Sequence, residues 1–175
     1  MLVAPIKLTG RADGEAIVWG NSRNDLAKHS DLVAVLEHQC ESDALELSVE
    51  TAIEFDGYAI IDCTLTATQD VSLDALGQYI PLRTKYAKLC YGDRVLPPDA
   101  EILINEWYSG TIEGDQSFRF SPTIWLGADR RGLVWQSESD EDWRNADRQR
   151  AIEILPRGEA TTFRAHFVDQ ATSLK

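Results

Sequence analysis

Neighbouring acids are the first residues in this sequence that could do chemistry. Asp140 and Glu141 form the only adjacent Asp-Glu pair, and Glu54 and Asp56 also lie close together. Glycoside cleavage requires two carboxyl groups that face the sugar from about 5–10 Å apart. Either pair could supply them only if the fold turned both side chains toward one bound sugar.

The residues that other reactions need are missing or wrongly spaced. No G-x-S-x-G segment marks a serine nucleophile, and no cysteine has an activating sequence around it. His166 lies in a predicted strand, where a half-buried surface histidine is commoner than a catalytic base. The acids from Asp140 to Asp142 could offer oxygen ligands to calcium, but they lack the alternating spacing and central glycine of a calcium loop. We therefore expect a solvated acidic turn, no metal site and no cofactor.

Aromatic residues could bind carbohydrate, because an exposed ring face stacks on a pyranose. The candidates are Trp107, Tyr108, Trp125, Trp135 and Trp143. Tryptophans that alternate along strands are more often core residues. For Trp125 and Trp143 we favour packing near a hairpin, on a surface that docks another domain.

A hairpin followed by an acidic turn is predicted to position these residues. Alternate residues of its first arm would share one face, namely Phe118, Phe120, Pro122, Ile124 and Leu126. The segment Gly127 to Gly132 is polar with a glycine at each end, as a hairpin loop needs, and Leu133 to Ser137 is the return strand. The acidic run that follows contains Glu138 and Asp140, either of which could pair with Arg144 and hold the turn.

The tract from Trp125 to Trp143 reads WLG-x-D-x-RGL-x-W-x-x-ESD-x-x-W. It resembles the N-terminal β-sandwich domain of glycoside hydrolase family 123-like proteins. Weaker similarity extends back through Ile80–Leu82 to Glu54–Gly57 and forward to Phe167–Asp169. One departure is Asp142, where a glycine is expected before the tryptophan, so the turn geometry is expected to differ.

The resemblance implies a sandwich that precedes a (β/α)8 barrel. In that family the barrel holds the catalytic Asp-Glu pair and reads β-linked N-acetylgalactosamine. We therefore carry no catalysis onto Asp140 or Glu141 and expect no catalytic residue here. The chain stops at Lys175 without a barrel. Residues 1–175 are thus expected to be a single β-sandwich domain, a fragment of a larger protein whose C-terminal catalytic barrel would follow.

The composition excludes several partner classes. With 17 basic and 29 acidic residues, the formal net charge is −12. Such a chain lacks the basic surface expected for binding nucleic acid or anionic membranes. No run of 18 apolar residues predicts a membrane span. The start, Met1 to Pro5, does not look like a signal peptide. The chain is expected to be soluble. The location of the parent protein stays open, and a secreted or periplasmic parent is one alternative.

The strand pattern predicts an all-β fold with little helix. Alternating or apolar segments predict strands at Glu15–Gly20, Ala44–Ala52, Ile53–Thr68, Val71–Leu82, Glu101–Tyr108, Ala151–Leu155 and Ala160–Val168. Asp31–Cys40 is either a strand or a short buried helix, and Asn21–Ser30 is predicted to be a loop with a helical turn. Short alternating strands separated by turns favour a two-sheet antiparallel β-sandwich, with a single barrel as the alternative.

The chain contains three cysteines. Cys40, Cys63 and Cys90 are expected to be buried free thiols, with one disulfide plus a free thiol as the alternative.

The leading hypothesis is a non-catalytic sandwich that supports a glycoside hydrolase barrel. The alternatives are a free-standing carbohydrate-binding module and a protein-interaction domain. The candidate carbohydrate or domain-interface residues are Trp125, Trp135, Glu138, Asp140 and Trp143.

Overall fold

The computed structural model describes residues 1–93 and 107–175. The chain divides into two compact units. Unit 1 comprises Met1–Arg11 and Asp74–Thr172, and unit 2 comprises Ala12–Leu73 and Ser173–Lys175. Strands β1 and β7 cross the boundary between the units. The predicted strand Glu101–Tyr108 lies outside the described residues except for its last two.

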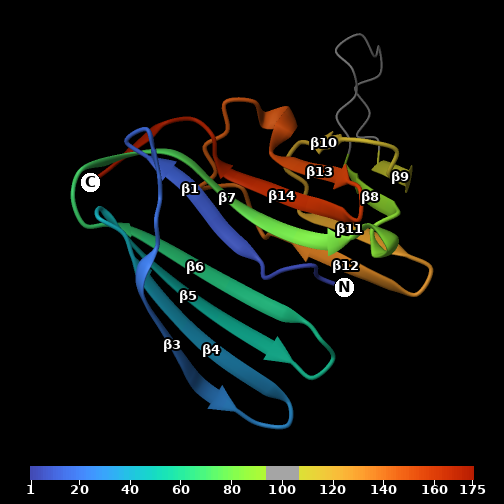
Figure 1. Cartoon of the computed structure of the whole chain (residues 1–175), viewed down its shortest axis with the longest axis horizontal. Helices are drawn as coiled ribbons and strands as arrows, with labels where there is room; N and C mark the ends of the chain where they lie inside the picture. Colours follow the sequence, from blue (N-terminus) through green and yellow to red (C-terminus); the bar gives the residue numbers. More distant parts are fainter. Residues whose placement is uncertain (94–106) are drawn as a thin grey trace. The chain divides into compact units, whose positions relative to one another are not determined.

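Unit 1 contains two antiparallel sheets (Figure 1). The first is a seven-stranded sheet of order β10-β13-β14-β7-β1-β2, in which β15 also pairs with β7. Five of its strands lie mainly in unit 1, namely β1 (Lys7–Ala12), β7 (Val71–Arg83), β10 (Gln116–Phe118), β13 (Ile152–Arg157) and β14 (Ala160–Val168). The second has the order β12-β11-β8-β9, formed by β8 (Leu89–Asp93), β9 (Trp107–Thr111), β11 (Thr123–Ala128) and β12 (Arg131–Gln136). Two 3-10 turns, η1 (Thr84–Tyr86) and η2 (Arg148–Arg150), lie between strands.

The core of unit 1 is built from the inward faces of both sheets. Its buried residues are Ile80, Leu82, Ala87, Cys90, Phe118, Ile124, Leu126, Trp135, Ile152, Ile154, Phe163 and Ala165. These positions alternate along each strand, because successive side chains of a strand point to opposite faces. Two sheets that share one apolar layer form a β-sandwich. The predicted all-β antiparallel fold is confirmed, and a third sheet is present in unit 2.

Unit 2 holds a four-stranded antiparallel sheet in sequence order, β3-β4-β5-β6 (Figure 1). Its strands are β3 (Gly20–His29), β4 (Val33–Glu41), β5 (Leu45–Glu54) and β6 (Ala59–Ala67). The short strand β2 (Glu15–Ala16) also falls in unit 2, and β15 (Thr172–Leu174) spans the boundary. Each connection is a tight hairpin, so neighbouring strands in sequence are neighbours in the sheet.

Strand β3 contradicts the predicted loop at Asn21–Ser30. The segment was expected to be irregular because it is polar throughout, but it pairs with β4 over nearly its whole length. Every residue of β3 is exposed. A strand at the edge of a sheet with no buried face carries no apolar alternation, so its sequence gives no periodic signal. The same pairing shows that Val33–Cys40 of the segment Asp31–Cys40 is strand and not helix, while Asp31 and Leu32 lie in the hairpin turn before it.

The central hairpin is confirmed, although its loop is shorter than predicted. Gly127 pairs with Gly132 inside the ladder, so only Asp129 and Arg130 connect the arms. The expected shared face begins at β11, because Phe118 belongs to β10 in the other sheet. The last predicted hairpin is also confirmed as β13 and β14. A register shift between His166 and Val168 turns Val168 inward, where it is 7% exposed.

The three cysteines are free thiols. Cys40 and Cys90 are buried, as expected, whereas Cys63 on β6 is exposed. The burial expected for Cys63 is wrong because its strand has no buried side chain. Among the described residues, no helix has the length and apolar character needed to cross a membrane.

Candidate functional site

A pocket lies where the acidic turn leaves β12 and the chain passes on toward β13. It has a volume of about 420 Å³. Its lining includes Arg119, Phe120, Asp140, Trp143, Asn145 and Arg148. Asp140 and Trp143, two of the predicted site residues, thus line one pocket together. The backbone N–H of Trp143 donates to the carbonyl of Asp140 at 3.0 Å, which closes the turn between them.

The end of β14 holds the pocket segment in place. The backbone N–H of Arg144 donates to the Phe167 carbonyl at 2.7 Å, and the Asp169 N–H donates to the Arg144 carbonyl at 2.9 Å. The Asn145 side chain donates to the His166 carbonyl at 2.7 Å. These bonds fix the segment against a strand of the core, so the pocket wall does not depend on an unsupported loop.

Trp143 is half-buried in a cluster of aromatic rings. Its ring meets Phe120 at 5.2 Å and Phe167 at 5.1 Å between centroids, both edge to face. Trp135 lies 6.2 Å away on the core side. Edge-to-face pairs at these distances are favourable beyond the area they bury. The Trp143 ring is therefore held in one orientation beside the pocket.

Trp135 itself is a core residue. It is 8% exposed and packs against Phe163 at 5.3 Å. Its indole N–H donates to the side-chain oxygen of Gln78 at 2.9 Å, which satisfies the only polar atom of the ring. A buried indole with its donor satisfied presents no face to a ligand.

Trp125 lies on the face of β11 that points away from the core. A Cβ added to Gly127 would come within 2.3 Å of the Trp125 ring, and one added to Gly132 within 2.8 Å of its indole nitrogen. The ring therefore lies flat over these two glycines, which explains why the sequence places glycine at both positions. Trp125 does not line the pocket with Trp143.

The acidic turn is organised differently from the prediction. The guanidinium of Arg144 donates to the carbonyls of Glu141 and Trp143, at 2.9 and 3.0 Å. It thus binds backbone oxygens and not the carboxylates of Glu138 or Asp140, because the turn points its carbonyls toward that side chain. Glu138 is exposed and does not line the pocket.

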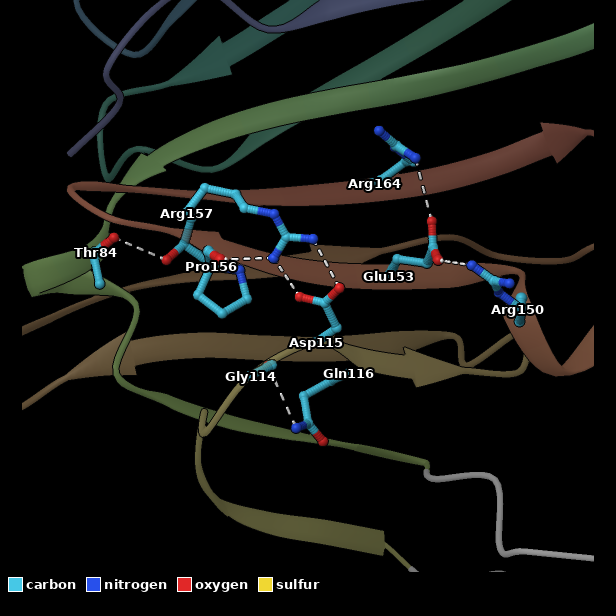
Figure 2. Close-up of polar contacts among 10 residues, drawn as sticks. Thr84, Gly114, Asp115, Gln116, Arg150, Glu153, Pro156, Arg157 and Arg164 are labelled. Atoms are coloured by element: carbon cyan, nitrogen blue, oxygen red, sulfur yellow. Dashed lines mark hydrogen bonds and ion pairs between the residues drawn. The ribbon is translucent and has the colours of Figure 1, made fainter.

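A second polar cluster surrounds Glu153 on β13 (Figure 2). This carboxylate is 4% exposed. It accepts hydrogen bonds from Arg150 at 2.6 Å, from His166 at 2.8 Å and from Arg164 at 3.3 Å. Arg164 also stacks over the Tyr79 ring at 4.6 Å. Burial alone would raise the pKa of Glu153, but the hydrogen bonds and charges of Arg150 and His166 outweigh it and hold the pKa below its usual value.

An ion pair joins the ends of two neighbouring strands of the first sheet. Asp115 immediately precedes β10, and Arg157 is the last residue of β13. The two terminal guanidinium nitrogens of Arg157, Nη1 and Nη2, donate to the two carboxylate oxygens of Asp115 (Figure 2). The hydrogen bond from Arg157 lowers the pKa of the Asp115 carboxyl. Both side chains are exposed, so water screens this pair. No group of three or more His, Cys, Asp or Glu side chains in the described residues is arranged to hold a metal ion.

The sheet of unit 2 has two chemically different faces. One cross-strand row places Asp25, Glu37, Glu50 and Asp62 directly opposite one another. The next row, which points to the other face, contains Leu26, Leu36, Thr51 and Ile61. The apolar members of that second row are exposed by 59%, 39% and 38% respectively. At these two rows, one side of the unit 2 sheet is acidic and the other is apolar and exposed, although the next row on the acidic side is apolar and contains Val35, Ala52 and Ile60, of which Ile60 is 44% exposed.

The family model described as "Glycoside hydrolase 123, third domain" matches residues 1–146. The chain belongs to this family. The description names a third domain, so the N-terminal position implied by the sequence resemblance stays a prediction. No curated protein and no solved structure matches the chain.

In this family 123 domain, sequence reasoning found part of the pocket and missed the rest. Asp140 and Trp143 stood out because they belong to the matching tract. Arg119 and Arg148 lie far apart in sequence and meet at the pocket only through the fold. Alternation along β14 places Arg164 and His166 on one face, and pairing β13 with β14 puts Glu153 opposite Arg164. The Glu153 cluster could therefore have been found from the sequence.

Proposed function

We propose that this chain is a non-catalytic accessory domain of a glycoside hydrolase family 123 protein. In this proposal a separate domain performs catalysis, and unit 2 docks against that domain through its apolar face. The observation that carries the proposal is an exposed apolar sheet face in a domain that belongs to a multidomain hydrolase family. The resembled family acts on β-linked N-acetylgalactosamine, which its catalytic barrel reads, so the proposal assigns no substrate to this chain.

The apolar face extends beyond a single row. Ile53 is on the same side of the sheet and is 41% exposed. At the adjoining hairpin tips, the Phe55 N–H donates to the Leu32 carbonyl at 3.0 Å. The side chains of Leu32, Phe55 and Tyr58 there are exposed by 66%, 77% and 51%. Exposed apolar side chains gathered on a sheet face and at its hairpin tips are typical of an interaction surface in soluble proteins.

The acidic row on the opposite side of the sheet favours docking through the apolar face. Four carboxylates in one cross-strand row repel one another unless water screens them. That row is therefore best placed in solvent, with the apolar face turned to a partner. Adjacent residues of β4 consequently give a matched pair of test positions, because Leu36 lies on the apolar face and Glu37 on the acidic one.

Limited proteolysis of the full-length parent protein tests the docking. Leu36→Ser removes apolar contact, so we expect the junction between this domain and the catalytic domain to be cut several-fold faster. Glu37→Ser alters the neighbouring residue on the solvent face and should leave the cutting rate unchanged. Equal rates for both variants and the wild type would contradict docking through this face.

A further inference from the structure

Strand β6 forms an open edge of the unit 2 sheet (Figure 1). It pairs with β5 along its whole length, from Ala59 to Ala67, without a register shift. No described residue donates or accepts a backbone hydrogen bond on its other side. The open edge of a sheet is a row of unpaired N–H and C=O groups, which can pair with a strand of another chain.

The hydrogen bonds to β5 show which backbone groups of β6 point outward. At one end of the ladder the Glu54 N–H donates to the Tyr58 carbonyl at 2.8 Å, and at the other the Thr68 N–H donates to the Ala44 carbonyl at 2.9 Å. Hydrogen-bonded and non-hydrogen-bonded pairs alternate along an antiparallel ladder, and both ends agree on the alternation. The even-numbered residues of β6 therefore bond to β5. The odd-numbered residues present both backbone groups to the open edge, namely Ala59, Ile61, Cys63, Leu65 and Ala67.

The opposite edge of the same sheet, β3, is protected against such pairing. Its ladder with β4 has two register shifts, one between Gly20 and Arg23 and one between Leu26 and Lys28. Bulges and charged side chains, lysine above all, keep edge strands from pairing with other chains. Strand β6 has neither a bulge nor a lysine, and Asp62 is its only charged residue. Of the two edges, β6 is therefore the one suited to pairing.

The sequence of β6 is complementary to a second copy of itself. Cys63 is the middle residue of the nine, and its backbone groups point outward. A two-fold axis at Cys63 therefore pairs two β6 strands antiparallel over their full length, with every outward group bonded to one of the second copy. On the apolar side of the sheet, Ala59 then lies opposite Ala67 of the second copy, and Ile61 opposite Leu65. The side chains that meet on that side are all apolar.

Charge and length select this register over its neighbours. With the axis at Cys63, Asp62 lies opposite Thr64 of the second copy. An axis at Asp62 would place two carboxylates directly opposite one another, where like charges are destabilising. An axis at Thr64 would take Ala59 and Ile60 out of the ladder. The axis at Cys63 leaves the two Asp62 side chains on a diagonal, about 7–8 Å apart, where salt screens their repulsion.

We propose that two copies of this chain associate through β6 and form one continuous antiparallel sheet across a two-fold axis at Cys63. The occupant of the edge is a second copy because β6 matches itself in length, in the alternation of its outward groups and in its apolar pairs. The contact uses the edge of the sheet, whereas the docking proposed above uses its apolar face. The two proposals are therefore independent, although both concern unit 2.

Sedimentation equilibrium of the 175-residue chain tests the dimer, with two substitutions at one position as a matched pair. Cys63→Pro removes an outward N–H, and an edge strand tolerates proline there because that N–H does not bond to β5. Cys63→Ser keeps the N–H. We expect wild type to dimerise in the micromolar range, Cys63→Pro at least about tenfold more weakly, and Cys63→Ser as wild type. Urea denaturation checks that both variants are folded.

The Asp62 carboxylate provides a second matched pair. Asp62→Asn removes the repulsion across the axis, so the dimer should become several-fold tighter. Glu37→Gln removes the same charge two strands away in the same cross-strand row and should have a smaller effect. Equal tightening by both variants would contradict the register, since it would indicate only a general effect of the net charge.

Cross-linking with a short bismaleimide tests the axis without proline. In this register the two Cys63 Cα atoms lie about 5.5 Å apart. Cys40 and Cys90 are buried, so their thiols are shielded from the reagent. We expect a covalent dimer linked from Cys63 to Cys63 in wild type and none in Cys63→Ser.

Two outcomes would overturn the proposal. One is a folded wild-type chain that stays monomeric up to about 1 mM and gives no Cys63 cross-link. The other is a dimer that folded Cys63→Pro forms as tightly as wild type, which would place the contact at another surface. The Leu36→Ser variant should dimerise normally, so failure of the docking and failure of this contact are distinguishable.

Discussion

Replacement of Glu153 by glutamine should destabilise unit 1 substantially. Glutamine keeps the shape of the side chain and one acceptor oxygen, but it removes the negative charge that Arg150, Arg164 and His166 share. Hydrogen bonds to charged groups contribute about 1.5–3 kcal/mol each when they are shielded from water. Arg150 is 61% exposed and regains water, and the Arg164 bond is long at 3.3 Å, so both losses are discounted.

The expected loss in free energy of unfolding at pH 7 is about 2 kcal/mol. For a protein of this size, that corresponds to a fall in Tm of roughly 4–8 °C. Urea denaturation followed by tryptophan fluorescence measures it, because Trp135 and Trp143 report on unit 1. The matched control is Asp115→Asn, which breaks the exposed pair with Arg157 and should leave stability unchanged. A change below about 0.5 kcal/mol for Glu153→Gln would refute the reasoning.

The pH dependence gives a second test of the same cluster. The pKa of Glu153 is lower in the folded protein than its usual 4.5, so the folded state binds this proton less readily than the unfolded state. Its stabilising contribution is therefore complete above pH 4.5 and is lost as the pH falls through the lowered pKa. The stability difference between wild type and Glu153→Gln should shrink in that acidic range. A difference that stays constant down to pH 3 would contradict the coupling.

Two further predictions follow from buried and exposed side chains. Trp135→Phe removes the hydrogen bond to Gln78 and part of a buried ring, so urea denaturation should show a loss of about 2 kcal/mol; no loss would contradict its core role. Of the three thiols, only Cys63 should react with Ellman's reagent in the folded chain. Its reaction should be slow at neutral pH and accelerate as pH rises, because partial shielding and the Asp62 carboxylate raise the pKa of the thiol. Labelling of all three cysteines at one rate would contradict the described burial.

The sequence predicted the fold where one face of a strand is buried. In the β11–β12 and β13–β14 hairpins, alternating apolar residues mark the core face, so their strands could be placed from periodicity. Strand β3 has no buried face, and no periodic signal exists for it. The inward turn of Val168 depends on a register shift, which alternation alone cannot show.

The candidate site could be predicted only in part, for a similar reason. Asp140 and Trp143 are three positions apart, so a local tract reveals both. Arg119 reaches the same pocket from a segment before β11, and no local pattern links it to them. The apolar face of unit 2 likewise appears only when the register places Leu26, Leu36 and Ile61 in one row.

The central claim is that this domain docks against the catalytic domain of a family 123 hydrolase through the apolar face of unit 2. A calorimetric titration of the separately produced catalytic domain with this chain tests it most directly. The account predicts saturable binding with a negative heat-capacity change, about tenfold weaker for Leu36→Ser and unchanged for Glu37→Ser. Absence of binding between the two folded domains, or equal weakening by both variants, would contradict it.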